Sequence, residues 1–184
     1  MKHPKLVISL LLTVLATTAL QAQNRYVHSK EGTLLGRRVD AIVACATQSH
    51  KDWSRATKVT ICKCMVDLMN HHFSDKQIER HARDGVVGLF GEDSSLANQV
   101  RDCSVNNEKG WSDFQQEYAL ECKKTLQEAT PKPLDPAKID EFGHCQLEMV
   151  LSNEAPNIEI KKLDDPNSDS FQKIVKKCGS PFKG

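Results

Sequence analysis

Apolar residues recur along most of this chain at steps of three and four, which is the spacing of a helix that turns one face toward a core. The pattern is clearest in the middle of the first half, where it runs through Val59, Cys62, Val66, Met69 and Phe73. These positions predict an amphipathic helix with Cys62 in the centre of its buried stripe.

Capping residues mark the expected boundaries around this helix. Asp52 is the predicted N-cap at its start, because a short polar side chain there accepts a hydrogen bond from a free backbone N–H. A second helix is expected to begin at Ser74, which has the capping-box spacing to Gln77. Phe73 and Ile78 fit the hydrophobic staple that accompanies such a start.

The same periodicity predicts five further helices, and each of them carries a cysteine. They are expected over residues 35–46, 93–103, 112–126, 135–149 and 171–178. Ser112 with Gln115 has capping-box spacing, and Asp135 followed by Pro136 is a strong start signal. Gly179 is the predicted stop of the last helix. Val and Ile alternate too little to predict a strand, so the expected fold class is all-α.

Glycine, proline and polar residues predict the connections. Gly85 is the expected end of the second helix, and residues 86–92 are expected to form a flexible loop. Glycines recur there, but no strand precedes them and no Lys-Ser/Thr follows, which disfavours a phosphate-binding loop. Residues 23–30, 104–110, 130–136 and 153–168 complete the expected non-helical segments.

We expect three parts in the chain. Residues 1–22 have a positive start and an apolar run, which predicts a secretory signal peptide rather than a membrane span. Residues 23–110 and 111–184 each show helices with cysteines in a similar order, which predicts two related disulfide-stapled units of three to four helices packed together. The alternative is that the similar order is coincidence.

The cysteine pattern predicts disulfides in an oxidising compartment, and therefore a periplasmic or secreted protein. All seven cysteines are disulfide candidates: Cys45, Cys62, Cys64, Cys103, Cys122, Cys145 and Cys178. Two residues turn a helix by about 200°, so Cys62 and Cys64 are expected to form separate bridges, with Cys45 and Cys103 the nearest candidates. One thiol must stay unpaired or join two chains. If the two units are equivalent, the extra cysteine is Cys62 or Cys64.

Metal binding is one possible chemistry of the central helix. Met65, Met69 and His72 lie at i, i+4 and i+7, and thioether and imidazole ligands suit Cu(I). The simpler interpretation is that the methionines fill the core. No zinc-type set of clustered Cys and His ligands is present to complete a site.

Few sequence motifs support hydrolytic or redox chemistry. The helical Cys/His/Asp neighbourhood around Asp67 and His71 resembles that of secreted phospholipase A2, but it lacks the His-Asp dipeptide and the glycine-rich calcium loop. Neither a Gly-x-Ser-x-Gly nor a His-Glu-x-x-His motif occurs. The separation of Cys62 from Cys64 opposes a shuttling Cys-x-Cys pair.

The remaining hypothesis is a non-enzymatic protein-binding module, such as an inhibitor, an immunity-type protein or an assembly factor. The loops at residues 86–92 and 153–168 are the candidate binding surfaces, and Trp53 and Trp111 are candidate anchors for a partner protein. The net charge of +1 disfavours nucleic acid and anionic membranes as partners, and no cofactor is expected. The alternative is a metal-binding or thiol-redox protein that uses the stretch from Cys62 to His81. A homodimer through the odd cysteine is also possible.

Overall fold

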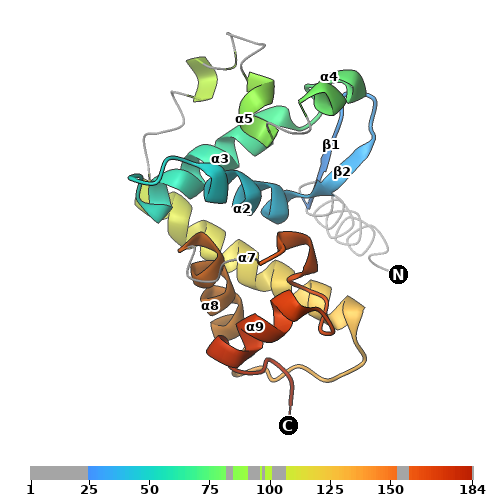
Figure 1. Cartoon of the computed structure of the whole chain (residues 1–184), viewed down its shortest axis with the longest axis vertical. Coiled ribbons are helices and arrows are strands. Elements are labelled where there is room, and N and C mark those ends of the chain that lie inside the picture. The colour runs from blue at the N-terminus through green and yellow to red at the C-terminus, as the bar shows by residue number, and fades with distance from the viewer. Residues whose placement is uncertain are drawn as a thin grey trace, which may run out of the picture.

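The structure is a computed structural model that describes residues 25–81, 85–90, 96, 98–100, 107–152 and 158–183. Most of these residues are helical, and two short strands form a small sheet (Figure 1). In chain order the elements are β1 (Tyr26–His28), β2 (Leu34–Arg37), α2 (Arg38–Gln48), α3 (Arg55–Met69), α4 (Asp75–Arg80), α5 (Gly85–Phe90), α7 (Asn107–Ala129), α8 (Ile139–Leu151), the 3-10 helix η2 (Ile160–Lys162) and α9 (Asp169–Cys178). The mostly helical prediction is confirmed, but the expectation of no strand is wrong.

Strands β1 and β2 pair in antiparallel fashion, with Val27 opposite Gly36 and a bulge beside this pair. The α3–α4 turn holds β1 on its other side, because the backbone N–H of His28 donates to Asn70 Oδ1 at 2.8 Å. The N–H of His71 in turn donates to the carbonyl of His28 at 2.9 Å. The expected loose N-terminus at residues 23–30 is therefore wrong over β1. Leu35 belongs to β2 rather than to the first helix.

Helix α3 buries the predicted apolar stripe against the core. The side chains of Val59, Cys62, Val66, Met69 and Phe73 are all buried. This confirms the sequence pattern, although Phe73 lies beyond the end of the helix.

The start of α3 differs from the prediction. Ser54 is its N-cap, and the Ser54 hydroxyl accepts from the backbone N–H of Thr57 at 3.1 Å. Asp52 lies two residues earlier in the exposed α2–α3 turn, so its assignment as the cap is wrong. Helix α3 ends at Met69 because Asn70 is extended, with a ψ of 120°, and His71 follows in a left-handed conformation with a φ of 62°.

Helix α4 has the predicted capping box. The N–H of Gln77 donates to the Ser74 hydroxyl, and Gln77 Oε1 accepts from the N–H of Ser74 at 3.0 Å. The helix ends at Arg80. Gly85 is the first residue of α5 and not the end of α4, so the predicted loop at residues 86–92 is wrong as far as Phe90.

Helix α7 is longer than expected. It begins at Asn107 and runs through Ser112, so the predicted cap at Ser112 and the end of the predicted loop at residues 104–110 are wrong. Its inner face matches the prediction. Phe114, Tyr118, Cys122 and Leu126 are all buried.

Helix α8 begins at Ile139, later than the predicted start at Asp135 and Pro136. Asp135 still organises the entry, because its Oδ1 accepts from the N–H of Ala137 at 3.0 Å and its carbonyl accepts from the N–H of Ile139 at 3.0 Å. Proline at position 136 therefore starts a turn that leads into the helix. The predicted buried residues Ile139, Phe142 and Met149 lie in the core.

Helix α9 ends where the sequence predicts and begins two residues earlier, at Asp169. The hydroxyl of Ser168 accepts from the N–H of Phe171 at 3.1 Å, and Gly179 ends the helix with a φ of 83°. The segment before α9 contains η2, so the predicted loop at residues 153–168 is wrong at Ile160–Lys162. Residues 153–157 lie outside the described residues.

Two disulfides are described. Cys45 of α2 bonds to Cys62 of α3, and Cys145 of α8 bonds to Cys178 at the end of α9. Cys64 is also disulfide-bonded. The prediction that Cys62 and Cys64 do not bond to each other is confirmed.

The unpaired cysteine among the described residues is Cys122, which is buried in α7. The expectation that the extra cysteine is Cys62 or Cys64 is therefore wrong. Cys103, and the predicted helix that ends there, fall largely outside the described residues.

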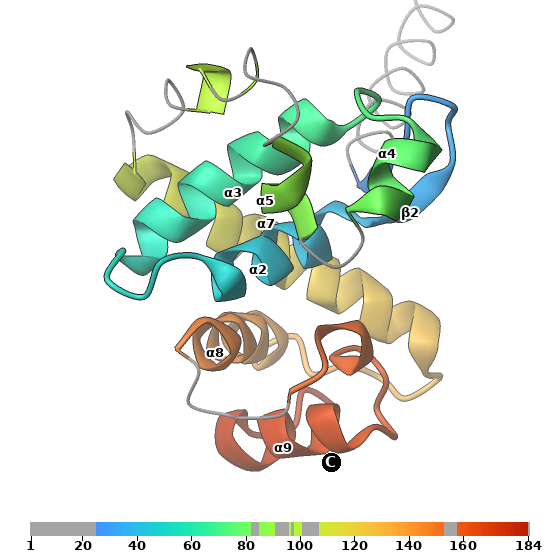
Figure 2. The same ribbon diagram turned by 45° about the horizontal axis from the view of Figure 1, so that its top comes forward.

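Helix α7 occupies the centre of the arrangement. Figure 2 shows it between α2 and α3 on one side and α8 and α9 on the other, and α7 packs against both α3 and α8. The predicted boundary between residues 110 and 111 falls within this helix. The related two-unit organisation stays a prediction, as does the signal peptide at residues 1–22, which lies outside the described residues.

Candidate functional site

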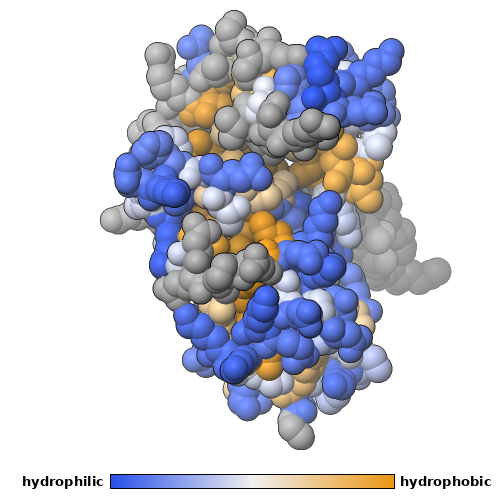
Figure 3. Space-filling view, viewed as in Figure 1, coloured by the Kyte–Doolittle hydropathy of each residue, from blue (hydrophilic) through white to orange (hydrophobic). Residues whose placement is uncertain are grey.

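One hollow in the described part of the molecule is an apolar groove of about 640 Å³. One side is formed by β1, β2, α2 and the end of α3, and the other by the segment 158–161. Its apolar lining residues are Val27, Leu35, Gly36, Ala41, Ala44, Met69, Ile158 and Ile160. Figure 3 shows hydrophobic surface near the middle of this face, where Figure 1 places α2 beside the C-terminal half. We refer to this hollow as the apolar groove.

The sequence folds locally so that α2 presents small side chains to the groove. Asp40, Ala41 and Ala44 share one face of α2 and line the groove together with Arg37, the last residue of β2. Gly36 precedes them in β2 with a φ of 148°, and a Cβ at this position would meet nothing within 4 Å. The base of the groove at Gly36 therefore carries no side chain and is open.

An ion cluster centred on Arg37 adjoins the groove. Arg37 Nε donates to Asp40 Oδ2 at 2.8 Å, and a second guanidinium nitrogen donates to the Thr125 hydroxyl at 2.6 Å. Arg37 also pairs with Asp164, which follows η2. The cluster thus joins α2, α7 and the C-terminal wall of the groove.

Burial and charge act in opposite directions on these groups. Burial raises the pKa of Asp164 to about 6, although the charge of Arg37 opposes the rise. Burial likewise raises the pKa of Asp40. Burial alone would lower the pKa of Arg37, but the two carboxylates outweigh it and the pKa is raised.

A buried hydrogen-bond network lies between α7 and α8. The Tyr118 hydroxyl donates to Gln146 Oε1 at 3.2 Å, and the Cys122 thiol approaches the same oxygen at 3.4 Å. Gln146 Nε2 donates to the carbonyl of Leu163 at 3.0 Å. Burial raises the pKa of the Cys122 thiol, so this cysteine is not an activated nucleophile.

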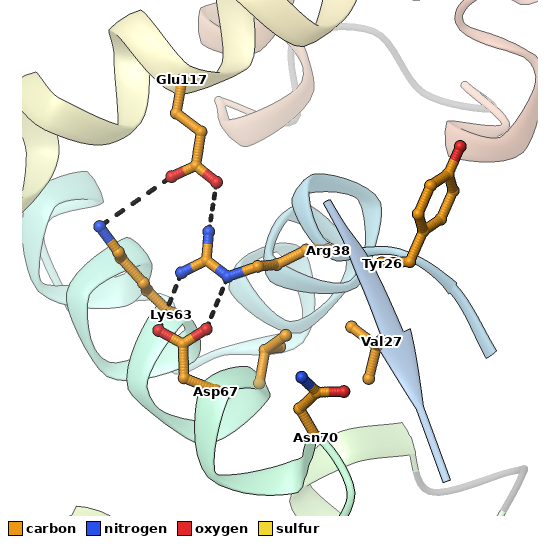
Figure 4. Close-up of a pocket in the computed structure, with 8 residues that line it drawn as sticks. Tyr26, Val27, Arg38, Lys63, Asp67, Asn70 and Glu117 are labelled. Atoms are coloured by element: carbon orange, nitrogen blue, oxygen red, sulfur yellow. Dashed lines mark hydrogen bonds and ion pairs between the residues drawn. The ribbon is translucent and has the colours of Figure 1, made fainter. Parts of the chain in front are cut away.

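A second, polar pocket of about 430 Å³ lies among β1, α2, α3 and α7 (Figure 4). Arg38 lies between two carboxylates there, with two guanidinium nitrogens donating to Asp67 at 2.6 and 2.8 Å and a third pairing with Glu117. Lys63 lies 4.0 Å from Glu117. These two cations and two anions compensate one another, so the pocket is best understood as an ionic junction of three helices.

The candidate metal ligands do not lie on one helix face. Met65 and Met69 are buried in the core, whereas His72 is exposed beyond the end of α3. The expectation of a single face is wrong because the helix ends at Met69 and the chain turns at His71. Among the described residues, no group of three or more His, Cys, Asp or Glu side chains is placed to hold a metal ion.

The two candidate anchors lie away from the groove. Trp53 is 42% exposed in the α2–α3 turn, with its ring 6.2 Å from that of His50. Trp111 is partly buried against the core near the start of α7. Neither tryptophan lines the apolar groove.

The sequence prediction of a binding loop at residues 153–168 includes one wall of the groove, but the groove itself was not predicted. Ala41 and Ala44 carry a faint signal, because two small residues on one helix face leave room for a neighbour. The opposite wall comes from residues 158–161, more than a hundred residues later in the chain, and no local pattern relates the two.

Comparisons with family models, with curated proteins and with solved structures give no match to this chain. In the part of the chain that the structure describes, no helix has both the length and the apolar character needed to cross a bilayer.

Proposed function

We propose that this chain is a secreted or periplasmic, non-enzymatic protein-binding module, and that the apolar groove is its binding site. An inhibitor, an immunity-type protein and an assembly factor are the kinds of protein that work in this way. The single observation that carries the proposal is the groove itself, since an open apolar hollow with a few polar groups at its edge is the usual form of a recognition site.

The disulfides support the proposed compartment. The Cys45–Cys62 and Cys145–Cys178 bridges each tie two helices together. Such bridges persist in oxidising compartments, and they support a rigid body whose groove is already formed before a partner arrives. A preformed site loses less conformational entropy on binding.

The alternative of a metal-binding or thiol-redox protein has less support. Cys62 and Cys64 are both held in disulfides with other partners, so they do not form an exchanging pair. Met65 and Met69 are used in the core. We therefore carry the binding hypothesis forward.

Affinity capture with matched variants tests the proposal. The immobilised chain is exposed to the soluble proteins of its own compartment, beside Ala41→Arg in the groove and Ala129→Arg at the exposed end of α7. We expect one protein to be retained by wild type and Ala129→Arg but lost with Ala41→Arg, because a buried guanidinium in an apolar site is costly. Circular dichroism checks that both variants fold. Equal retention by all three would contradict the proposal.

A further inference from the structure

The two disulfides that the structure describes differ in how far solvent reaches them. Cys45 and Cys62 are 3% and 0% exposed, so their bridge lies inside the core. Cys145 and Cys178 are both partly exposed, and Cys178 is the last residue of α9, directly before the exposed Gly179. A reducing thiolate must touch a sulfur atom to attack it, so access governs which bridge exchanges in the folded protein. We refer to the Cys145–Cys178 disulfide as the α8–α9 bridge.

Helix α9 depends on its packing against α8. It has ten residues, which is shorter than the about 12–15 residues at which isolated helices begin to be stable in water. Its inner face contributes Phe171 and Ile174 to the core, and the centroid of the Phe171 ring lies 5.6 Å from that of Phe142 in α8. The α8–α9 bridge fixes the last residue of the helix. Loss of this bridge therefore lowers the stability of α9 on α8.

Helix α9 in turn holds one wall of the apolar groove. The backbone N–H of Glu159 donates to the Ser170 hydroxyl at 3.0 Å, and the Ser168 hydroxyl donates to the carbonyl of Lys162 at 2.6 Å. Glu159 lines the groove, so this wall is hydrogen-bonded to the start of α9. A less stable α9 therefore loosens the wall.

We propose that the α8–α9 bridge is a redox-sensitive switch: an external dithiol reduces it in the folded protein, and α9 and residues 158–162 then open locally. One thiolate of the dithiol forms a mixed disulfide with one cysteine of the bridge, and the other cysteine leaves as a thiolate and takes up a proton. The second dithiol sulfur then displaces the first cysteine. The dithiol leaves as a disulfide, and Cys145 and Cys178 gain its two electrons and become thiols. This switch does not depend on what the groove binds.

Reduction of the full oxidised chain by dithiothreitol at neutral pH tests the first step. Aliquots are quenched with acid, unfolded and alkylated, and peptide mapping by mass spectrometry gives the reduced fraction of each cysteine. We expect Cys145 and Cys178 to become thiols about tenfold or more faster than Cys45 and Cys62, which serve as the control in the same molecule. Circular dichroism shows whether the chain stays folded meanwhile. Equal rates for both bridges, or faster reduction of the Cys45–Cys62 bridge, would overturn the inference.

Hydrogen exchange followed by mass spectrometry tests the second step. In the partly reduced chain, and in the double variant Cys145→Ser with Cys178→Ser, the amides of α9 and residues 158–162 should exchange about tenfold or more faster than in the oxidised chain. Helices α2 and α3, whose bridge stays closed, should be unchanged. Because the reduced wild-type chain gives the same readout, the test does not depend on the folding of the double variant. Unchanged exchange in α9, or equal acceleration in α2 and α3, would overturn a local switch.

Discussion

Gly143 of α8 lies directly against Ala119 of α7, and a Cβ at position 143 would come within 2.9 Å of the Ala119 Cα and 3.1 Å of its Cβ. This contact sets how closely the two helices approach. Helix α7 packs against α3 on another side, so its position is shared by both halves of the molecule.

Gly143→Ala should therefore destabilise the protein, even though alanine is the better helix former by about 1 kcal/mol. The added methyl group meets backbone, which cannot rotate away, and such overpacking costs about 1–3 kcal/mol. Urea unfolding followed by circular dichroism measures the change. Adding Ala119→Gly should rescue it only in part, because the nearest atom is the Cα. A stabilised Gly143→Ala variant would show that α7 and α8 are further apart.

The start of α3 gives a second prediction. Ser54→Ala should lower the free energy of unfolding by about 1 kcal/mol, because it removes the acceptor for the N–H of Thr57. Asp52→Ala serves as the matched control and should change little, since Asp52 is an exposed turn residue. If Asp52→Ala lowered the free energy of unfolding more than Ser54→Ala in the same urea titrations, Asp52 would be the cap instead.

A third prediction concerns Cys122. Its thiol is buried, and burial raises its pKa, so iodoacetamide should label it only after unfolding. Mass spectrometry of non-reduced protein, alkylated before and after addition of guanidinium, locates the labelled cysteine. Rapid labelling of native Cys122 would mean that α7 is exposed along this face and would return thiol chemistry to consideration.

The ion cluster beside the groove predicts an unusual pH dependence. Burial raises the folded-state pKa of Asp164 from 3.8 to about 6, so the folded chain holds a proton that the unfolded chain has already released. The contribution of Asp164 to stability is then fully present below about pH 4 and is lost as the pH rises through 6, by up to about 3 kcal/mol. Asp40 and Glu121 act on Asp164 in the same direction.

Urea unfolding between pH 4 and 7 measures this contribution as the difference between wild type and Asp164→Asn. We expect the advantage of wild type over the variant to shrink across this interval. An advantage that grows with pH would show that the Arg37 charge outweighs burial and that the folded pKa of Asp164 lies below its usual value.

The helices were the predictable part of this fold, for a physical reason. A buried stripe at helical spacing, as in Val59 to Met69, reports local geometry and burial at once. Cap chemistry located α4 and α9 correctly at Ser74 and Gly179. Where a strong cap signal fell inside a longer helix, as at Ser112, side-chain chemistry alone misplaced the boundary.

The strands and the groove were beyond the reach of the sequence. Strands as short as β1 and β2 are too brief to show alternation, and β1 is stabilised by Asn70 from a distant turn. The groove brings Ala44 and Ile160 to one site through tertiary packing. Helix α5 was not predicted because Gly85 and Gly88 resemble a loop, although the helix ends in the buried Leu89 and Phe90.

Site-specific photocrosslinking in living cells tests the binding role of the groove most directly. A photoreactive residue replaces Glu159, which is exposed at the edge of the groove, or Lys173, which is exposed on α9. We predict that the chain labelled at position 159 crosslinks to one protein of defined mass, that the chain labelled at 173 does not, and that Ala41→Arg abolishes the crosslink. Equal crosslinking from both positions, or none from position 159 in a folded and exported chain, would contradict a protein-binding groove.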